Sequence, residues 1–166
     1  YADYKLTDCA VIYKHRHNAV IKREEDRAIF IYKAAESLKK GKMYDLTIRK
    51  LYDFHGLREV TVLGDSRQKG DVSGMGAFYL DYTGQDLSED RYQNEVVNRL
   101  QGKYRNGYFY YGDDNKIKLY FADDQDRPDN GMAIKLNNVR VGCYRYPELV
   151  IERAGQWVPT TSDLDE

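Results

Sequence analysis

The sequence has little of what marks disulfide-rich, zinc-binding or membrane-spanning proteins. It holds two cysteines, three prolines and one tryptophan among 166 residues. Cys9 and Cys143 allow at most one disulfide, and neither belongs to a CxxC pair or a zinc-type spacing. No apolar run approaches the roughly 18 residues that a membrane-spanning helix needs. These absences argue against a disulfide scaffold, a cysteine zinc site and a helical membrane protein.

Motifs for catalysis and metal binding are also missing. There is no Gly-x-Ser-x-Gly elbow and no Gly-x-x-x-x-Gly-Lys phosphate loop. His15 and His17 could share one side of a strand, but zinc takes three or four ligands. The acidic stretch 123–131 lacks the spacing of an EF-hand loop and is typical of a polar turn. We predict no enzyme activity, no cofactor and no metal site.

Tyrosine is the residue in clear excess. There are 16 tyrosines against five phenylalanines, while 32% of the residues are charged. Tyrosine favours strands and tolerates half-exposed positions because its hydroxyl stays hydrated. With a mean hydropathy of -0.77, the composition predicts a lean core under a very polar surface. Small β-barrels, which bury one narrow interior, have this character.

Charge is distributed unevenly along the chain. The net charge of -1 excludes a polycation of the kind that binds nucleic acid through overall charge. Residues 1–63 hold 13 Lys+Arg and 9 Asp+Glu, a balance of +4, and the rest hold 13 and 18, a balance of -5. Any nucleic-acid site must therefore be a local patch.

The sequence repeats itself at an offset of 88 residues. Residues 14–51 align with 102–139 without a gap, and their apolar positions agree. The agreement includes an irregular three-residue step, from Ile48 to Leu51 and from Leu136 to Val139. A break in strand alternation at the same place in both copies indicates a shared bulge or bend. With one inserted residue, Glu59 aligns with Glu148, so we predict an internal duplication.

Each copy is expected to form five strands. The first copy predicts strands at Ala10–Tyr13, Ala19–Lys22, Ile29–Tyr32, Met43–Phe54 and Glu59–Leu63, with a short helix at Ala34–Lys40 closed by Gly41. The second predicts strands at Val96–Leu100, Tyr108–Tyr111, Lys116–Phe121, Met132–Tyr144 and Glu148–Ile151. Five strands with a connector between the third and fourth are typical of an OB-fold. The fold class is therefore all-β with one short helix, as two tandem five-stranded OB-fold-like barrels.

These strands predict four segments along the chain. The first barrel takes residues 1–63, and a Gly-rich linker with an extra strand at Met75–Tyr82 takes 64–90. The second barrel takes residues 91–152. Residues 153–166 form a C-terminal tail, in which Gln156–Val158 is expected to dock and the remainder to fray.

The segment from Gly41 to Val60 resembles the second half of known OB-fold domains, with the pattern Gly-x-x-hydrophobic followed by Gly-x-x-Glu. Over roughly residues 4–63 and 92–152 the chain is similar to tandem OB-fold domains of uncharacterised secreted or lipid-anchored bacterial proteins. The resemblance implies a non-catalytic binding module of an exported protein, periplasmic or anchored at the outer membrane, whose ligand is a protein or glycan. The start at Tyr1, without Met, is interpreted as a trimmed leader, with a lipid anchor upstream.

OB-folds commonly bind along their second and third strands, which gives an alternative function. If Ile29 and Ile31 point inward, Phe30 and Tyr32 point outward. Cations interleaved with aromatics on such a face suit phosphate contacts and base stacking, and so favour single-stranded nucleic acid. A solvated sheet face, with Tyr and Lys present for strand propensity, explains the same pattern. The predicted face comprises Arg16, His17, Lys22, Arg23, Phe30 and Tyr32 in the first copy, and Tyr104, Arg105, Tyr108, Tyr110, Lys118 and Tyr120 in the second.

Overall fold

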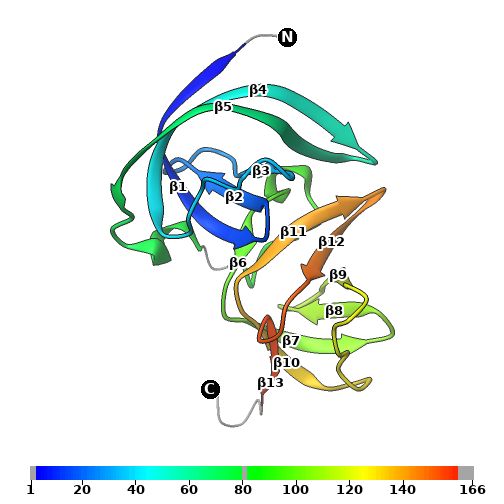
Figure 1. The fold of residues 1–166 in the computed structure, drawn as a ribbon. Coiled ribbons are helices and arrows are strands. Elements are labelled where there is room, and N and C mark those ends of the chain that lie inside the picture. The colour runs from blue at the N-terminus through cyan, green and yellow to red at the C-terminus, as the bar shows by residue number, and fades with distance from the viewer. Residues whose placement is uncertain (1–2, 80–81, 161–166) are drawn as a thin grey trace. The chain divides into compact units, whose positions relative to one another are not determined.

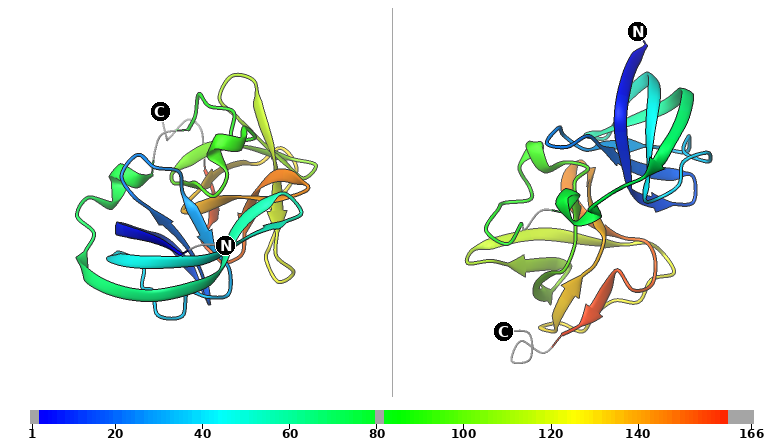
Figure 2. Two further views of the ribbon diagram at one scale, coloured as in Figure 1. Left: turned by 90° about the horizontal axis from the view of Figure 1, so that it is seen from above. Right: turned by 90° about the vertical axis from the view of Figure 1, so that its left-hand side faces the viewer.

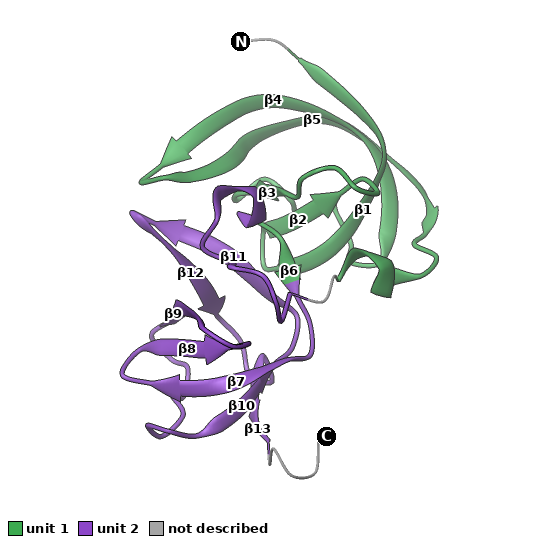
Figure 3. Ribbon diagram, turned by 180° about the vertical axis from the view of Figure 1, so that it is seen from behind, with its two compact units in different colours: residues 1–79, 94–96 green, residues 80–93, 97–166 purple. Residues whose placement is uncertain are grey.

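The chain forms two compact β units, described here from a computed structural model (Figure 1). The structure describes residues 3–79 and 82–160. Unit 1 comprises the residues up to Tyr79 together with Asn94–Val96, and unit 2 comprises residues 80–93 and 97–166 (Figure 3). Apart from two short 3-10 helices, η1 (Met75–Phe78) and η2 (Asp90–Tyr92), the regular elements of the described residues are all strands. The predicted all-β class is confirmed.

Unit 1 is a closed five-stranded barrel with the strand order β1-β2-β3-β5-β4. Its third and fifth strands pair in parallel, and the other neighbours are antiparallel. The curvature of β4 and β5 around the barrel is visible in both views of Figure 2. This order is that of an OB-fold. The strands are β1 (Tyr4–His15), β2 (Asn18–Lys22), β3 (Ile29–Ile31), β4 (Lys42–Phe54) and β5 (Leu57–Asp71).

Strand alternation places one set of small and branched side chains inside this barrel. Val11, Ile21 and Ile31 lie in its core, in neighbouring strands. The residues between them in sequence point to the other side of the sheet. The interior of unit 1 is thus filled by side chains at alternate positions, as in other small barrels.

Three expected features of the first half differ in the structure. Ala34–Lys40 is a turn segment and not a helix, because the Lys14 ammonium binds the carbonyl oxygens of Ala35 and Leu38, the latter at 2.7 Å. The expected linker start at Gly64 lies within β5, whose second half pairs with the beginning of β4. Of the expected strand at Met75–Tyr82, residues 75–78 form η1, while 80 and 81 lie outside the described residues.

Unit 2 has the same strand order in an interrupted form. The sheet runs β13-β10-β7-β8-β9-β12-β11-β6. The single strand expected at Met132–Tyr144 is two strands, β10 and β11, because Asn138 between them is left-handed with φ 56°. The strands are β6 (Val96–Val97), β7 (Leu100–Arg105), β8 (Tyr108–Tyr111), β9 (Asn115–Phe121), β10 (Ala133–Leu136), β11 (Val139–Tyr144), β12 (Tyr146–Ile151) and β13 (Trp157–Pro159).

The two units share the register of their parallel strand pair. In unit 1, Phe30 pairs with Glu59, and in unit 2, Lys118 pairs with Glu148. These are equivalent positions in the sequence alignment of the two copies. The predicted irregularity also occurs in both, as register shifts on either side of Lys50 and as the break at Asn138. The repeated topology is therefore observed, and duplication as its origin stays a prediction.

The break in unit 2 is held by a buried glutamine. Gln156 is 2% exposed, and its Oε1 accepts hydrogen bonds from the backbone N–H groups of Glu152 and Arg153 at 2.7 and 2.9 Å. Its Nε2 donates to the carbonyl oxygen of Asn138 at 2.9 Å. The next residue, Trp157, begins β13 and pairs with β10. The predicted docking of Gln156–Val158 is confirmed, and residues 161–166 of the predicted tail lie outside the described residues.

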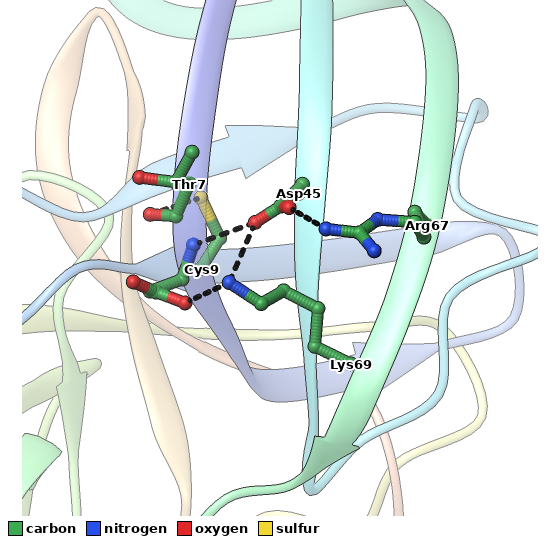
Figure 4. Close-up of polar contacts among 6 residues, drawn as sticks. Thr7, Cys9, Asp45, Arg67 and Lys69 are labelled. Atoms are coloured by element: carbon green, nitrogen blue, oxygen red, sulfur yellow. Dashed lines mark hydrogen bonds and ion pairs between the residues drawn. The ribbon is translucent and has the colours of Figure 1, made fainter.

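A charged network fixes a bulge in β1 (Figure 4). Asp8 has a left-handed backbone (φ 56°), and the β1–β4 register shifts beside it. Its N–H donates to Asp45 Oδ1 at 3.1 Å, and Arg67 donates to Asp45 Oδ2 at 2.8 Å. Lys69 donates to Asp8 Oδ1 at 2.5 Å and lies 3.3 Å from Asp45 Oδ1. The Arg67 hydrogen bond lowers the pKa of Asp45, and the Asp8 hydrogen bond raises the pKa of Lys69.

Cys9 and Cys143 are not joined by a disulfide. Cys9 lies in the unit 1 core, where burial raises the pKa of its thiol to about 11. The thiolate is the nucleophilic form, so Cys9 is unreactive at neutral pH. Within the described residues, no helix is long and apolar enough to cross a membrane.

Asp45→Asn is expected to destabilise unit 1 at neutral pH. A carboxylate whose pKa is lowered by folding stabilises the fold above its unfolded pKa of about 3.9, and this contribution disappears as pH falls through the folded pKa. The unfolding midpoints of wild type and Asp45→Asn should differ at pH 7 and converge in acid. Asp65→Asn, an exposed aspartate on β5, is the matched control and should behave as wild type. A constant difference at all pH values would contradict the role given to the charge.

Gln156→Ala is expected to cost about 1–3 kcal/mol of unit 2 stability, because it leaves two partly buried N–H groups and one carbonyl without their partner. Urea unfolding followed by the fluorescence of the neighbouring Trp157 measures this directly. Gln101→Ala, at an exposed position of β7, should change the midpoint little. Equal midpoints for the two variants would show that the glutamine does not hold the break.

Candidate nucleic-acid interface

Buried and exposed side chains alternate along β7, β8 and β9. In β8, Phe109 and Tyr111 are buried, whereas Tyr108 and Tyr110 are exposed. In β9, the buried positions are Ile117, Leu119 and Phe121, and the residues between them point out. This period of two results from filling a barrel interior from one side of each strand. It leaves the other side of all three strands to polar and aromatic residues.

Strand register arranges these outer residues in two rows. In the first row, Tyr108 pairs with Arg105 on one side and with Lys118 on the other. In the second row, Tyr110 lies between Lys103 and Lys116 in the same way. Each row therefore has a tyrosine at its centre and a cation on both neighbouring strands. We call the six residues of these rows, together with Tyr120, the outer face: Lys103, Arg105, Tyr108, Tyr110, Lys116, Lys118 and Tyr120.

The tyrosine rings of the outer face are open to solvent. Tyr108, Tyr110 and Tyr120 are 39%, 40% and 42% exposed. The Lys116 ammonium lies 5.0 Å from the centre of the Tyr108 ring, within range of a cation–π interaction. The rings are thus accessible for stacking, while cations stand beside them.

The acidic side chain of Glu148 borders the first row. Glu148 on β12 pairs with Lys118 in the sheet, and its carboxylate lies 3.9 Å from the Lys118 ammonium. Burial raises the pKa of Glu148, and the charges of Lys118 and Arg140 oppose that effect. Glu148 is 6% exposed, so Lys118 is the more accessible partner of this pair. The carboxylate partly offsets the positive potential at this end of the first row.

A hollow of about 590 Å³ adjoins the second row. Lys103, Tyr110 and Lys116 form part of its wall, and the β8–β9 turn forms another part. Gly102 contributes bare backbone, and a Cβ there would stand 2.3 Å from the carbonyl oxygen of Tyr110. The remaining lining residues are Gln101, Tyr111, Gly112, Asp113, Asp114, Asn115, Ala133 and Thr160.

Most of the face expected in the second copy is brought together. Arg105, Tyr108, Tyr110, Lys118 and Tyr120 all lie on the outer face. Tyr104 does not, because its side chain points into the unit 2 core and meets Phe121 edge-on at 5.7 Å. Tyr104 pairs across the β7–β8 hairpin with the buried Phe109, and paired residues on neighbouring strands point to the same side of the sheet.

The expected face of the first copy is largely covered. Phe30 and Lys22 are 1% and 6% exposed. They do point away from the barrel core, but residues 94–96 return to this side of the sheet. There, Glu95 binds the Lys22 ammonium at 2.5 Å and the N–H of Ala28 at 2.9 Å. The expected exposure of Lys22 is therefore wrong because Glu95, distant in sequence, binds its ammonium; the expected exposure of Phe30 is wrong because its side chain is buried.

The other first-copy residues remain partly or fully accessible. Arg16 and His17 are exposed in the β1–β2 turn. Arg23 lies 3.8 Å from Asp26, and Tyr32 is half-buried with Lys33 5.1 Å from its ring centre. They form no rows comparable to those of unit 2. Whether any of the predicted residues binds a ligand stays a prediction.

Lys116 is the residue of the outer face that sequence reasoning missed. It lies two residues before Lys118 and therefore on the same side of β9. In the β8–β9 hairpin, Lys116 lies opposite Tyr110. Deducing this register from the sequence would have identified Lys116. Within the described ranges, no three His, Cys, Asp or Glu side chains come together as a metal site.

Comparisons with known proteins add structural likeness only. No family model matches the chain, and no curated protein matches it. Among solved structures, a p204 HINb domain has a TM-score of 0.40 at 12% identity, over 96% of this chain and 97% of that one. A murine DNA-binding protein bound with double-stranded DNA has a TM-score of 0.40 at 11% identity, over 96% and 98%. The HINa domain of Ifi202, in complex with 20-bp double-stranded DNA, has 0.38 at 10%, over 96% and 95%.

At these identities and TM-scores, the neighbours carry no inference about what this chain binds. The OB-like character of the two units rests on their strand order and register. The resemblance to secreted or lipid-anchored bacterial proteins stays a prediction.

Proposed function

We propose that this chain is an OB-fold module that binds single-stranded nucleic acid on the outer face of β7, β8 and β9. The observation that carries the proposal is the pair of rows, each with an exposed tyrosine between two cations. Aromatic rings stack on bases without regard to sequence, and Lys and Arg bind the phosphates between them. The strand pairs that form the rows lie on the side of the barrel that OB-folds use for ligands.

The spacing of the tyrosines favours a single strand over a duplex. Tyr108 and Tyr110 are two residues apart on one strand, which places them about 6.8 Å apart along it. Bases stacked in a duplex are about 3.4 Å apart along each strand and are already occupied by their neighbours. An extended single strand can place successive bases on the two rings, with its backbone beside the flanking cations.

A protein or glycan ligand at a cell surface is the other hypothesis raised by the sequence. Tyrosine-rich surfaces of low net charge suit such ligands as well. The cations on both sides of each tyrosine would attract a polyanion, whereas a neutral glycan carries no charge for them to bind. We therefore favour nucleic acid, and an exported location stays a separate prediction.

The test is fluorescence anisotropy with a labelled oligo(dT) at low salt. Tyr110→Ala should weaken binding about 5- to 150-fold, since stacking on one ring contributes about 1–3 kcal/mol. Tyr146→Ala is the matched control, because Tyr146 is 75% exposed on β12 and lies outside the rows. Raising salt should reduce affinity with a log–log slope near -2.8, from four cations at about 0.7 each. Binding that is absent at low salt, or equally weakened in the control, would end the proposal.

Glu148→Gln is expected to strengthen binding. The substitution removes the carboxylate that offsets Lys118 and keeps the size of the side chain. We expect a gain of about two- to fivefold in affinity for oligo(dT) at low salt, and a smaller gain at high salt, because the effect is electrostatic. Glu152→Gln is a control of the same chemistry that does not border the rows: its carboxylate pairs with Arg140. Unchanged affinity in Glu148→Gln would contradict contact between the bound nucleic acid and Lys118.

A further inference from the structure

A second cavity lies in unit 1, at one end of the barrel, and it is independent of the outer face. Its volume is about 360 Å³. Leu6, Ile29, Ile48 and Val60 line it, and these residues also form or contact the core of the barrel. The cavity therefore opens directly on the barrel interior. The remaining lining residues are Tyr4, Arg27, Ala28, Arg49, Leu51, Arg58 and Asn94.

Burial distinguishes a floor and a rim in this barrel cavity. Val60, Ala28 and Ile48 are 1%, 6% and 7% exposed, so the floor is apolar and deep. Leu51 is 67% exposed, and Arg27 and Arg49 are also exposed. Guanidinium groups and apolar atoms therefore share the opening. In the part of the chain that the structure describes, no acidic side chain lines the cavity, but the exposed Asp3 carboxylate lies 3.8 Å from Arg49 and an anionic ligand would compete with it.

The cavity wall also holds an acceptor that the protein itself does not satisfy. Asn94 is 3% exposed, and its Nδ2 donates to the carbonyl oxygen of Arg58 at 3.0 Å. Its Oδ1 is buried without a hydrogen-bond partner among the described residues. The oxygen is closed to solvent in this conformation, so a ligand reaches it through a small shift of the Asn94 side chain, and a donor placed there would satisfy an acceptor that is costly to leave unpaired. Asn94 therefore adds a preference for a donor group near the cationic rim.

We propose that the barrel cavity binds small amphiphilic acids: an apolar chain in the floor, an anionic head at the arginines, and an N–H donor toward Asn94. N-acyl amino acids combine these three groups. Pockets of about 300–1,000 Å³ with apolar walls and a few placed polar groups are typical small-molecule sites, and mouths of β-barrels are among their usual places. Arginine pairs with carboxylate through two parallel hydrogen bonds, which orients the head. The cavity's volume suits one chain and excludes a folded partner.

The experiment is isothermal titration of the whole chain with N-decanoylglycine below its critical micelle concentration. We expect one-site binding at the micromolar level, lost or strongly weakened for the methyl ester, which lacks the charge. Decanoate, which lacks the amide, should bind more weakly than N-decanoylglycine. In Asn94→Ala this preference for the amide should disappear while decanoate still binds.

Arg49→Gln should weaken binding of N-decanoylglycine about tenfold or more, because a charge-assisted hydrogen bond is lost. Arg16→Gln is the matched control, since Arg16 is an exposed turn residue of the same unit outside the cavity. Leu51→Lys tests the apolar opening without touching the buried floor, and it should weaken the decanoyl ligand more than an acetyl analogue. Absence of binding, equal affinity for the ester, or equal loss in Arg16→Gln would overturn the proposal. Far-UV circular dichroism and thermal unfolding check that each variant is folded. Competition between oligo(dT) and N-decanoylglycine would also overturn a separate site.

Discussion

A five-stranded barrel closes only when its fourth strand pairs with the first strand as well as the fifth, and this requirement shapes both units. In unit 1, β4 pairs with β1 as far as Ile48 and then continues with β5 alone. Register shifts around Lys50 mark the bend at which it leaves β1. In unit 2 the strand is cut in two, so that β10 pairs with β7 and β11 pairs with β12. Bulges and left-handed residues are the usual means of turning a strand at a barrel corner.

The two units meet this requirement with different chemistry. The bend in unit 1 is continuous backbone, and the adjoining bulge of β1 is fixed by the charges around Asp45. At the break in unit 2, Gln156 donates to the carbonyl oxygen of Asn138, and it accepts from the N–H groups of Glu152 and Arg153, which follow the end of β12. A buried side chain that satisfies three backbone groups can replace a stretch of strand pairing, because the hydrogen bonds are equivalent in number.

Closure of the barrel depends on the side chains that point inward. The outward-pointing residues of the first three strands can therefore differ between the two units. In unit 1, Lys22 is buried against Glu95, which leaves the barrel end as the accessible cavity. A buried ion pair is weak evidence for stability, but removing either partner would leave an uncompensated charge, so the pair fixes where residues 94–96 return. In unit 2 the same side of the sheet is open and carries the rows. One topology thus offers a sheet face in one unit and a barrel cavity in the other.

The sequence was most informative where alternation continues along a strand, and least where distant residues meet. Period-two patterns predicted β8 and β9 almost residue for residue, and with them the exposed Tyr108, Tyr110 and Lys118. The same logic gave the correct direction for Lys22 but not its burial, because Glu95 binds its ammonium from 73 positions away in the sequence. The turn at Ala34–Lys40 has the composition of a helix, and Lys14 overrides that propensity by binding its carbonyls. Nothing in the local sequence indicates that Asn94 faces an apolar cavity.

A net charge of -1 is compatible with a polyanion site because the outer face separates its cations with tyrosines. Across a row, the two cations are two strands apart, about 9.6 Å, and along a strand they are two residues apart, about 6.8 Å. Repulsion in water at these separations is about 0.4–0.6 kcal/mol per pair, and salt screens it further over a Debye length of about 10 Å. The free protein therefore tolerates four cations, with Glu148 beside the first row and Asp113 and Asp114 in the wall of the hollow that adjoins the second row. Each phosphate of a bound strand would meet a cation at close range, where attraction exceeds that repulsion. The arrangement of charge along the sheet, which the overall composition conceals, is what makes the face suitable for a nucleic acid.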